Sequence, residues 1–284
     1  GRTLIVKDFT AVKRMPLTTQ EELFGLLRDV YDGHSKIRYG NKEERDYKDI
    51  TFAMIAGVTD IIHGDNRATL GERFLKVELV GEGTDEMSQV RAAITNSQLA
   101  EDKREGKQRL RSCVLGYLTY LYDNMNLDEL PRLPPESELR IASLAMVIGQ
   151  LRAGVDREGG AVRYRPRAEH GSRLAVQLTR MAQCLAFVKQ TDVTSDVLEL
   201  VEKVAFDTAI GFNLEIVECM AVKPRRVGKT REVLARKVGV SKATFDRIIR
   251  DMVELSIVEE VKLRGGRGNP SQLIKLSDKF LQLW

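Results

Sequence analysis

The segment from Gly239 to Ile257 constrains the fold of this chain more than any other stretch. Four large apolar residues recur there at spacings of three and four, which places them on one face of a helix: Phe245, Ile248, Ile249 and Met252. Ser241 stands at the expected N-cap of that helix, and Gly239 suits a tight turn that needs a positive φ. The pattern therefore predicts a turn followed by an amphipathic helix over residues 242–257.

The residues around this helix predict a helix on one side of it and two strands on the other. The sequence TREVLARKVGV (230–240) predicts a first helix with an apolar inner face formed by Val233, Leu234 and Val238. VEEVKL (258–263) and QLIKLS (272–277) predict two strands joined by a Gly-rich loop. A helix, a turn, a second helix and a two-stranded wing in this order resemble a winged helix-turn-helix.

Positive charge is concentrated in this C-terminal part of the chain. Residues 222–284 hold 15 Lys and Arg against 7 Asp and Glu, a net charge of +8, whereas the whole chain carries only +4. Residues 1–221 therefore carry −4, and this asymmetry favours a DNA-directed module attached to a mildly acidic body. The alternative is that the module binds a protein, because many charged helix faces are simply solvated.

Specific side chains are expected to contact DNA. Four residues lie on the side of the second helix opposite its apolar stripe, as expected of a helix laid in a major groove: Lys242, Thr244, Arg247 and Arg250. Arg264 and Arg267 stand in the loop between the two predicted strands. At the tip of a wing they would contact the DNA backbone or the minor groove.

Composition bounds the class and the compartment of the protein. The chain has 284 residues, of which 43% are hydrophobic and 30% charged, which predicts two or three folded domains rather than disorder. It contains neither an apolar run long enough to span a membrane nor a signal peptide. Cys113, Cys184 and Cys219 are widely spaced, which predicts buried, reduced thiols in a cytoplasmic protein. Three His residues without a CxxC pair predict no zinc site.

The N-terminal part predicts an α/β core. TLIVKDF (3–9) and ITFAMIAGVTD (50–60) are apolar runs typical of strands buried on both faces of a parallel sheet, and FLKVELVG (74–81) predicts a third strand. Between the first two, a helix over residues 19–33 would be capped by Thr18 or Thr19. Because the chain begins without Met inside an apolar run, we expect it to be a fragment of a longer protein.

Long helices are expected to follow from about Glu86. The predicted helical segments cover residues 87–125, 137–154, 170–190 and 194–220, and residues 156–166 are predicted to form a loop. Tyr117, Tyr120 and Leu121 are expected on a buried side of the first of these helices.

Four of these segments resemble parts of P-loop ATPases of the AAA+ type, specifically the MCM-helicase-like ATPases of phages, plasmids and other mobile elements. RTLIVKDFTAV is similar to the Walker B strand of that family, and IAGVTD is similar to its sensor-1 strand. TLGERFLKVEL resembles the segment that presents an arginine finger. HGSRLAVQLTRMAQCLAF, followed by VTSDVLELVEKVA, resembles the helical lid with its sensor-2 arginine.

The resemblance implies a role for four residues. Asp8 would hold Mg²⁺ or polarise the attacking water, and it would be the only acid there because Lys7 replaces the usual Asp. Thr59 would contact the γ-phosphate, with Asp60 as the neighbouring alternative. Arg73 would act on the nucleotide of an adjacent subunit in a ring, and Arg173 would reach the phosphates from the lid. Each also has an ordinary interpretation: Asp8 as the end of any α/β strand, Thr59 as a helix cap, and both arginines as solvated charges.

A phosphate-binding loop is missing from the sequence. Such a loop needs Gly-x-x-x-x-Gly-Lys-Ser/Thr, and the only Gly-Lys-Thr here is Gly228-Lys229-Thr230. Lys223 stands where the first glycine is required, and no apolar strand precedes it, so we reject this match. The chain alone is therefore expected to bind ATP poorly and to hydrolyse none.

Taken together, the resemblance implies three parts: residues 1–82 as the C-terminal half of an ATPase core, 83–221 as a helical region with the lid, and 222–284 as the winged helix. The implied fold is a partial α/β P-loop core, an α-helical lid and an α+β winged module. The implied function is that of the C-terminal part of a helicase-like or replication ATPase, which uses ATP and Mg²⁺, forms a homo-oligomeric ring and engages DNA. Two alternatives remain open: an ATP-independent transcriptional regulator, and an assembly protein whose wing surface binds a protein.

Overall fold

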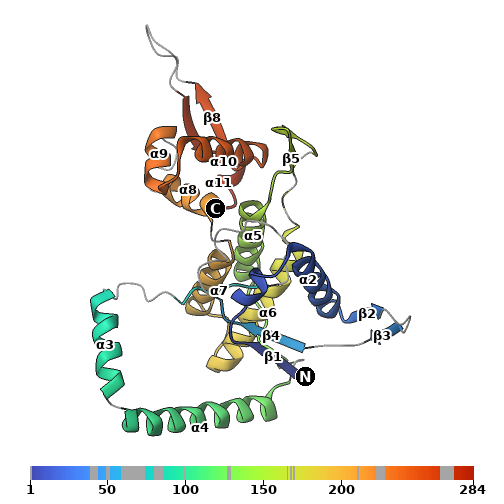
Figure 1. Ribbon diagram of the computed structural model, residues 1–284, viewed down its shortest axis with the longest axis vertical. Helices are drawn as coiled ribbons and strands as arrows, with labels where there is room; N and C mark the ends of the chain where they lie inside the picture. The colour runs from blue at the N-terminus through green and yellow to red at the C-terminus, as the bar shows by residue number, and fades with distance from the viewer. Residues whose placement is uncertain are drawn as a thin grey trace.

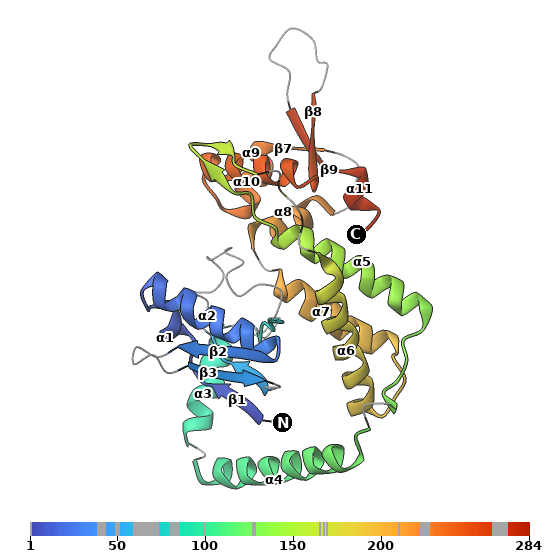
Figure 2. The same cartoon turned by 90° about the vertical axis from the view of Figure 1, so that its right-hand side faces the viewer.

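The computed structural model shows a mixed α/β protein that is mostly helical, with small sheets (Figures 1 and 2). The α/β expectation is confirmed at this level. The structure describes residues 2–38, 44–48, 52–58, 74–79, 86–98, 100–126, 129–164, 166, 168, 170–209, 211–221, 228–262 and 272–284. Within these ranges, none of the helices combines the length and the apolar character needed to cross a bilayer.

The N-terminal part is built on a pair of parallel strands. Strand β1 (Arg2–Val6) pairs with β4 (Phe52–Ala56), and between them come α1 (Thr10–Lys13), α2 (Leu17–Tyr31) and an antiparallel hairpin of β2 (His34–Arg38) and β3 (Glu44–Lys48). The hairpin forms in a stretch for which the sequence predicted no strand. Its polar composition hid it, because the sequence prediction of strands relied on apolar runs.

Three details of the N-terminal prediction are wrong. Burial of both strand faces is contradicted, because Ile5 is 67% exposed and Ile55 is 63% exposed. No strand forms over Phe74–Leu79, the described part of the expected third strand. Helix α2 starts directly after Pro16 with no side-chain cap, so neither Thr18 nor Thr19 is the N-cap; both lie inside the first turn. Pro16 occupies the N-cap position, where a hydroxyl-bearing residue was expected.

A small core joins α1 and α2 to the paired strands. Phe9 and Phe24 stack with ring centroids 6.2 Å apart, and Val12 and Leu27 complete the buried cluster. Phe74, from beyond β4, packs against the same cluster. The segment that follows Phe74 is tied to the helical region, since the Lys76 amide donates to Thr208 Oγ1 and the Glu78 amide to Asp207 Oδ2, both at 2.9 Å.

The middle of the chain is helical, as predicted. Helices α3 (Glu86–Gln98) and α4 (Ala100–Asn124) form an arm that reaches away from the body, as both views show (Figures 1 and 2). Helices α5 (Pro135–Arg152), α6 (Gly171–Lys189) and α7 (Ser195–Thr208) pack on one another. Strands β5 (Arg157–Glu158) and β6 (Ala161–Val162) form a short hairpin where a loop was predicted.

Burial on α4 differs from the prediction. Leu121 is buried as expected, but Tyr117 and Tyr120 are exposed. Among the described residues, α4 contacts the body near its C-terminal end, where the Tyr117 hydroxyl donates to the Val188 carbonyl oxygen of α6. Periodicity marks an apolar face correctly but does not tell whether another element covers it.

The C-terminal part combines helices with a three-stranded antiparallel sheet. Its helices are α8 (Phe212–Ala221), α9 (Arg231–Val238), α10 (Lys242–Glu254) and α11 (Asp278–Leu281). The strands β7 (Lys229–Thr230), β8 (Val258–Lys262) and β9 (Gln272–Leu276) pair in the order β7-β9-β8. Helix α8 lies before residue 222, yet it packs on α9, α10 and β9.

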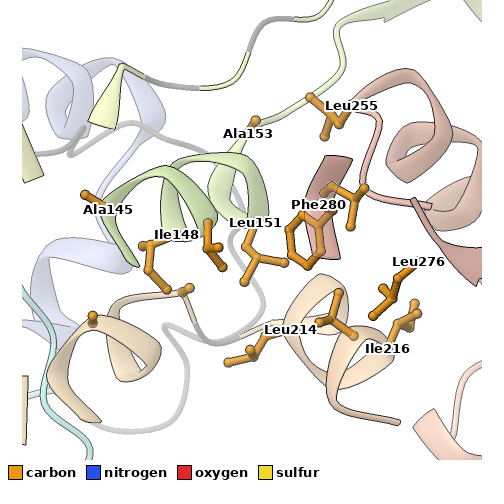
Figure 3. Packing of buried hydrophobic residues seen from close by; sticks show 14 of the residues in the cluster. Ala145, Ile148, Leu151, Ala153, Leu214, Ile216, Leu255, Leu276 and Phe280 are labelled. Carbon is orange, nitrogen blue, oxygen red and sulfur yellow. The ribbon is translucent and has the colours of Figure 1, made fainter. Parts of the chain in front are cut away.

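One hydrophobic core runs from the helical middle into this C-terminal part. Figure 3 shows Ile148 and Leu151 of α5 close to Leu214 of α8 and Phe280 of α11. The C-terminal residue, Trp284, extends this core, because its ring lies 5.4 Å from that of Phe206 and 5.8 Å from that of Phe280. The basic C-terminal part is therefore packed against the rest of the protein.

Candidate nucleic-acid interface

The turn between α9 and α10 has the predicted construction. Gly239 ends α9 with a φ of 72°, in the left-handed region that a glycine enters without steric cost. Ser241 caps α10, since its hydroxyl oxygen accepts the Thr244 amide at 3.2 Å. The turn thus fixes the angle at which α10 leaves α9, and it needs both of these residues.

The predicted apolar stripe of α10 is confirmed. Phe245, Ile249 and Met252 are fully buried, and Ile248 is nearly so, in the core that also holds Leu234 of α9. Val233 was assigned to the inner face of α9, and this is wrong, because it is 43% exposed. Helix α9 places the adjacent Leu234 at the centre of its buried face, so Val233 is turned away.

The opposite face of α10 presents cations to solvent. Lys242, Arg247 and Arg250 are exposed, whereas Thr244 is half-buried and takes part in the Ser241 cap. The Arg250 Nε donates to the Asp246 carbonyl oxygen at 3.2 Å, which holds that side chain along the helix. The buried stripe fixes the rotation of α10, so these cations are held on its outer side.

Ion pairs with other elements occupy the two aspartates of α10. Arg231 of α9 pairs with both Asp246 and Glu260 of β8, and Arg157 of the β5–β6 hairpin pairs with Asp251 at 2.7 Å. These side chains are only 19–32% exposed. The pairs lock α10 to its neighbours and offset the negative charge of the aspartates near Lys242, Arg247 and Arg250.

Sequence reasoning missed Arg231 and Arg157. Arg231 is 15 residues from its partner Asp246, and Arg157 is 94 residues from Asp251. Because each pair joins two different elements, no local spacing rule could identify it. The two predicted wing residues, Arg264 and Arg267, lie outside the described residues. The flanking strands β8 and β9 are antiparallel, with Val258 opposite Leu276 and Lys262 opposite Gln272.

Asp8 stands at the edge where the two parallel strands end. The Gly57 amide donates to the Val6 carbonyl oxygen at 2.9 Å, and the Phe9 amide donates to the Gly57 carbonyl oxygen at 2.8 Å. The segments leaving β1 and β4 therefore stay joined beside Asp8. A Cβ on Gly57 would lie 2.8 Å from the Lys7 carbonyl oxygen, so this approach requires a glycine.

The Asp8 carboxylate already has a structural partner. Its Oδ1 accepts the Thr10 amide at 2.8 Å, at the start of α1. Hydrogen bonds from the Thr10 side chain and from the Thr10 backbone hold the pKa of this exposed carboxyl below its ordinary value, so Asp8 is ionised at neutral pH. The ordinary interpretation, a carboxylate that caps a turn, thus accounts for this contact without a nucleotide.

Mg²⁺ in phosphoryl-transfer sites takes one or two protein carboxylates together with phosphate oxygens. The ionised Asp8 fits the role of such a single ligand. Within the part of the chain that the structure describes, no cluster of three or more His, Cys, Asp or Glu side chains is placed to hold a metal ion. Asp8 would therefore depend on bound phosphates for the remaining ligands.

The other predicted nucleotide residues are placed only in part. Thr59 and Arg73 lie outside the described residues. Arg173 is half-buried in the first turn of α6, which packs closely on α5, since a Cβ on Gly171 would lie 3.0 Å from the Ala145 carbonyl oxygen. One turn further along α6, Gln177 Nε2 donates to the Tyr31 hydroxyl of α2 at 3.1 Å, so α6 contacts the N-terminal part.

Gly228-Lys229-Thr230 has no phosphate-loop geometry. Lys229 and Thr230 form β7, which pairs with β9, and the Lys229 Nζ donates to the Cys219 carbonyl oxygen of α8. A Cβ on Gly228 would lie 2.8 Å from the Leu273 Cβ, so this glycine serves strand packing. The segment belongs to the C-terminal sheet, in agreement with its rejection as a P-loop.

The cysteines are free, but their predicted burial is wrong. Cys113 is exposed on α4, and Cys184 and Cys219 are half-buried. Burial raises the pKa of the Cys184 thiol above its ordinary value, which makes it a weak nucleophile.

Comparison with protein-family models gave no match for this chain, and comparison with curated proteins gave none either.

Proposed function

We propose that this protein binds DNA through α10 and that it is the C-terminal part of an ATP-driven, DNA-associated ATPase. The observation that carries the proposal is the two-sided character of α10, whose buried stripe fixes its rotation while Lys242, Arg247 and Arg250 face solvent. The order α9, turn, α10, β8 and β9 is that of a winged helix-turn-helix, in which the second helix enters the major groove.

Charge supports DNA over a protein partner. The segment 222–284 carries a net charge of +8, and the two aspartates of α10 are paired with arginines of other elements. Binding of a polyanion such as DNA to this surface is favoured, because it releases the counterions condensed on the polyanion. In this proposal Arg264 and Arg267 contact the DNA backbone or the minor groove from the wing, while α10 contacts bases in the major groove.

The first prediction concerns the cations of α10. Arg247→Ala and Arg250→Ala are each expected to weaken binding of a duplex by about 5- to 30-fold, because each removes a phosphate or base contact worth about 1–2 kcal/mol. Fluorescence anisotropy with a labelled duplex at fixed salt measures the change. Both side chains are exposed, so stability should stay within about 0.5 kcal/mol of the unsubstituted protein.

Arg132→Ala is the matched control, since Arg132 is an exposed arginine in the loop before α5, outside the proposed interface. Its affinity for DNA should equal that of the unsubstituted protein. If Arg247→Ala and Arg250→Ala bind as the control does, α10 does not carry the interface.

The nucleotide part of the proposal is supported by the parallel pairing of β1 and β4, which places Asp8 at the carboxyl edge of two adjacent strands. This edge is where α/β proteins bind phosphates. Asp8 would orient Mg²⁺ or the attacking water, Thr59 the γ-phosphate, and Arg73 and Arg173 would stabilise the charge of the transferred phosphoryl group. Arg73 acts across a subunit boundary in this scheme, so a ring of copies is part of the proposal.

A second candidate is an ATP-independent DNA-binding regulator. The hydrogen bond from the Thr10 amide to Asp8 favours it, because a turn cap explains this carboxylate without any nucleotide. Calorimetric titration of this chain with Mg·ATP tests the regulator candidate, because only that candidate uses no ATP. Under both candidates we expect this chain to bind ATP weakly or not at all and to hydrolyse none. Micromolar affinity with hydrolysis would contradict the regulator candidate, and it would also contradict the expectation that the chain has no phosphate-binding loop.

A further inference from the structure

Helix α4 carries a large apolar face that no other described element covers. Five residues of α4 lie on adjoining sides and are exposed to between 48% and 81%: Leu110, Val114, Leu115, Leu118 and Tyr122. Leu115, Leu118 and Tyr122 follow the spacing of three and four residues that makes one stripe along a helix. Together, the five exposed residues are called the α4 face below.

The arm holds this face away from the body. Both views show α4 as a straight helix that meets the body only at its C-terminal end (Figures 1 and 2). There, Leu121 is buried and the Tyr117 hydroxyl donates to the Val188 carbonyl oxygen. These contacts use the neighbouring side of α4, so its exposed face cannot turn inward while they hold.

The exposed area matches one half of a dimer interface. Five such side chains at these exposures present roughly 500 Å² of apolar surface. A standard interface buries about 800 Å² on each partner, of which somewhat more than half is apolar. The α4 face is therefore about as large as the apolar part of one side of such an interface.

Charge along the same side of α4 selects the orientation. Arg104, Lys107 and Arg111 continue the stripe toward the N-terminus at spacings of three and four residues. A parallel pair would place these cations against their own copies, which is repulsive. An antiparallel pair overlaps only the apolar halves, leaves Lys107 and Arg104 of the two copies at opposite ends, outside the overlap, and brings Arg111 of one copy to the Tyr122 ring of the other.

We propose that two copies of this protein associate through an antiparallel α4–α4 contact. The face is self-complementary, as a two-fold interface requires, because each copy supplies the same apolar half and the same cationic half. A two-fold pair closes on two subunits, so it differs from the head-to-tail contacts of a ring. The inference rests on the exposure of α4 and does not depend on DNA or nucleotide binding.

Sedimentation equilibrium of the full chain tests the proposal. We expect a dimer with a Kd on the order of micromolar, which is typical of an interface at the small end of the standard range. Leu115→Glu/Leu118→Glu should raise the Kd at least about 100-fold, because it places four carboxylates in the contact. Leu118→Gln, a milder change that keeps a good helix former, should raise it by about 10-fold.

Leu139→Glu is the matched control, since Leu139 is a 70% exposed leucine on α5, outside the α4 face. It should leave the Kd unchanged, and far-ultraviolet circular dichroism should be the same for all variants. A protein that remains monomeric at 100-fold above the expected Kd overturns the proposal. So does a monomer that binds phosphatidylserine vesicles through the same leucines, because the face would then serve a membrane surface.

Pulsed electron resonance tests the orientation. A spin label at Lys107→Cys, with Cys113, Cys184 and Cys219 replaced by Ser, should report a separation on the order of 30 Å in the antiparallel pair, from the rise of 1.5 Å per residue. A separation near 10 Å would show parallel helices and overturn the proposed arrangement.

Discussion

Phe245→Ala is expected to destabilise the C-terminal part by about 3–5 kcal/mol, the usual cost of removing a fully buried phenylalanine ring. Phe245 is fully buried and belongs to the stripe that fixes α10. The lost ring leaves a cavity between α10 and the core residues around Leu234. In the proposed interface the cations of α10 depend on the orientation of this helix, so DNA binding is expected to weaken as well.

The only tryptophan of the chain makes this prediction measurable. Trp284 packs on Phe206 and Phe280, so its fluorescence reports unfolding of the C-terminal part during a urea titration. Val253→Ala, at a 37% exposed position on the same helix, is the control and should cost less than about 1 kcal/mol. A cost below 1 kcal/mol for Phe245→Ala would mean that α10 does not pack through this stripe.

Asp207→Ala should cost about 2–3 kcal/mol, because it removes an almost buried carboxylate that accepts two hydrogen bonds. Asp207 Oδ2 accepts the Glu78 amide and the Lys203 ammonium, both at 2.9 Å. Without it the Glu78 amide has lost its acceptor, while the segment Phe74–Leu79 keeps its contacts with Thr208, with Lys203 and through its packed side chains. The segment directly follows Arg73, the residue proposed as an arginine finger.

Hydrogen exchange locates the effect. The amide of Glu78 should exchange at least about 10-fold faster in Asp207→Ala, while amides in α10 should be unchanged. Asp207→Asn retains an acceptor oxygen and should lose less than half as much stability. Equal exchange at Glu78 in Asp207→Ala and in the unsubstituted protein would show that this carboxylate does not anchor the segment.

Local patterns in the sequence predicted the C-terminal part well. Gly239, Ser241 and the four apolar residues of α10 act through turn geometry, capping and periodicity, all of which are set by residues a few positions apart. The error at Val233 has the same origin, because a valine next to the buried Leu234 satisfies an apolar pattern without facing the core.

Long-range features could not be predicted in the same way. The pairing of Arg157 with Asp251 and the anchoring of Lys76 and Glu78 on Thr208 and Asp207 join residues about 100 positions apart. The exposure of β1 and of the α4 face also escaped prediction, since apolar content does not reveal whether a partner covers it. Of the nucleotide residues, Asp8 and Arg173 have described surroundings, and their roles remain predictions.

The salt dependence of DNA binding by the full chain tests the central claim most directly. Each phosphate contact contributes about −0.9 to the slope of log K against log salt concentration. With Lys242, Arg247 and Arg250 facing a duplex, we predict a slope of about −3 or steeper between about 50 and 200 mM salt. A slope near zero, or no measurable binding at the lowest salt, would contradict the proposal that α10 is the DNA-contacting surface of this protein.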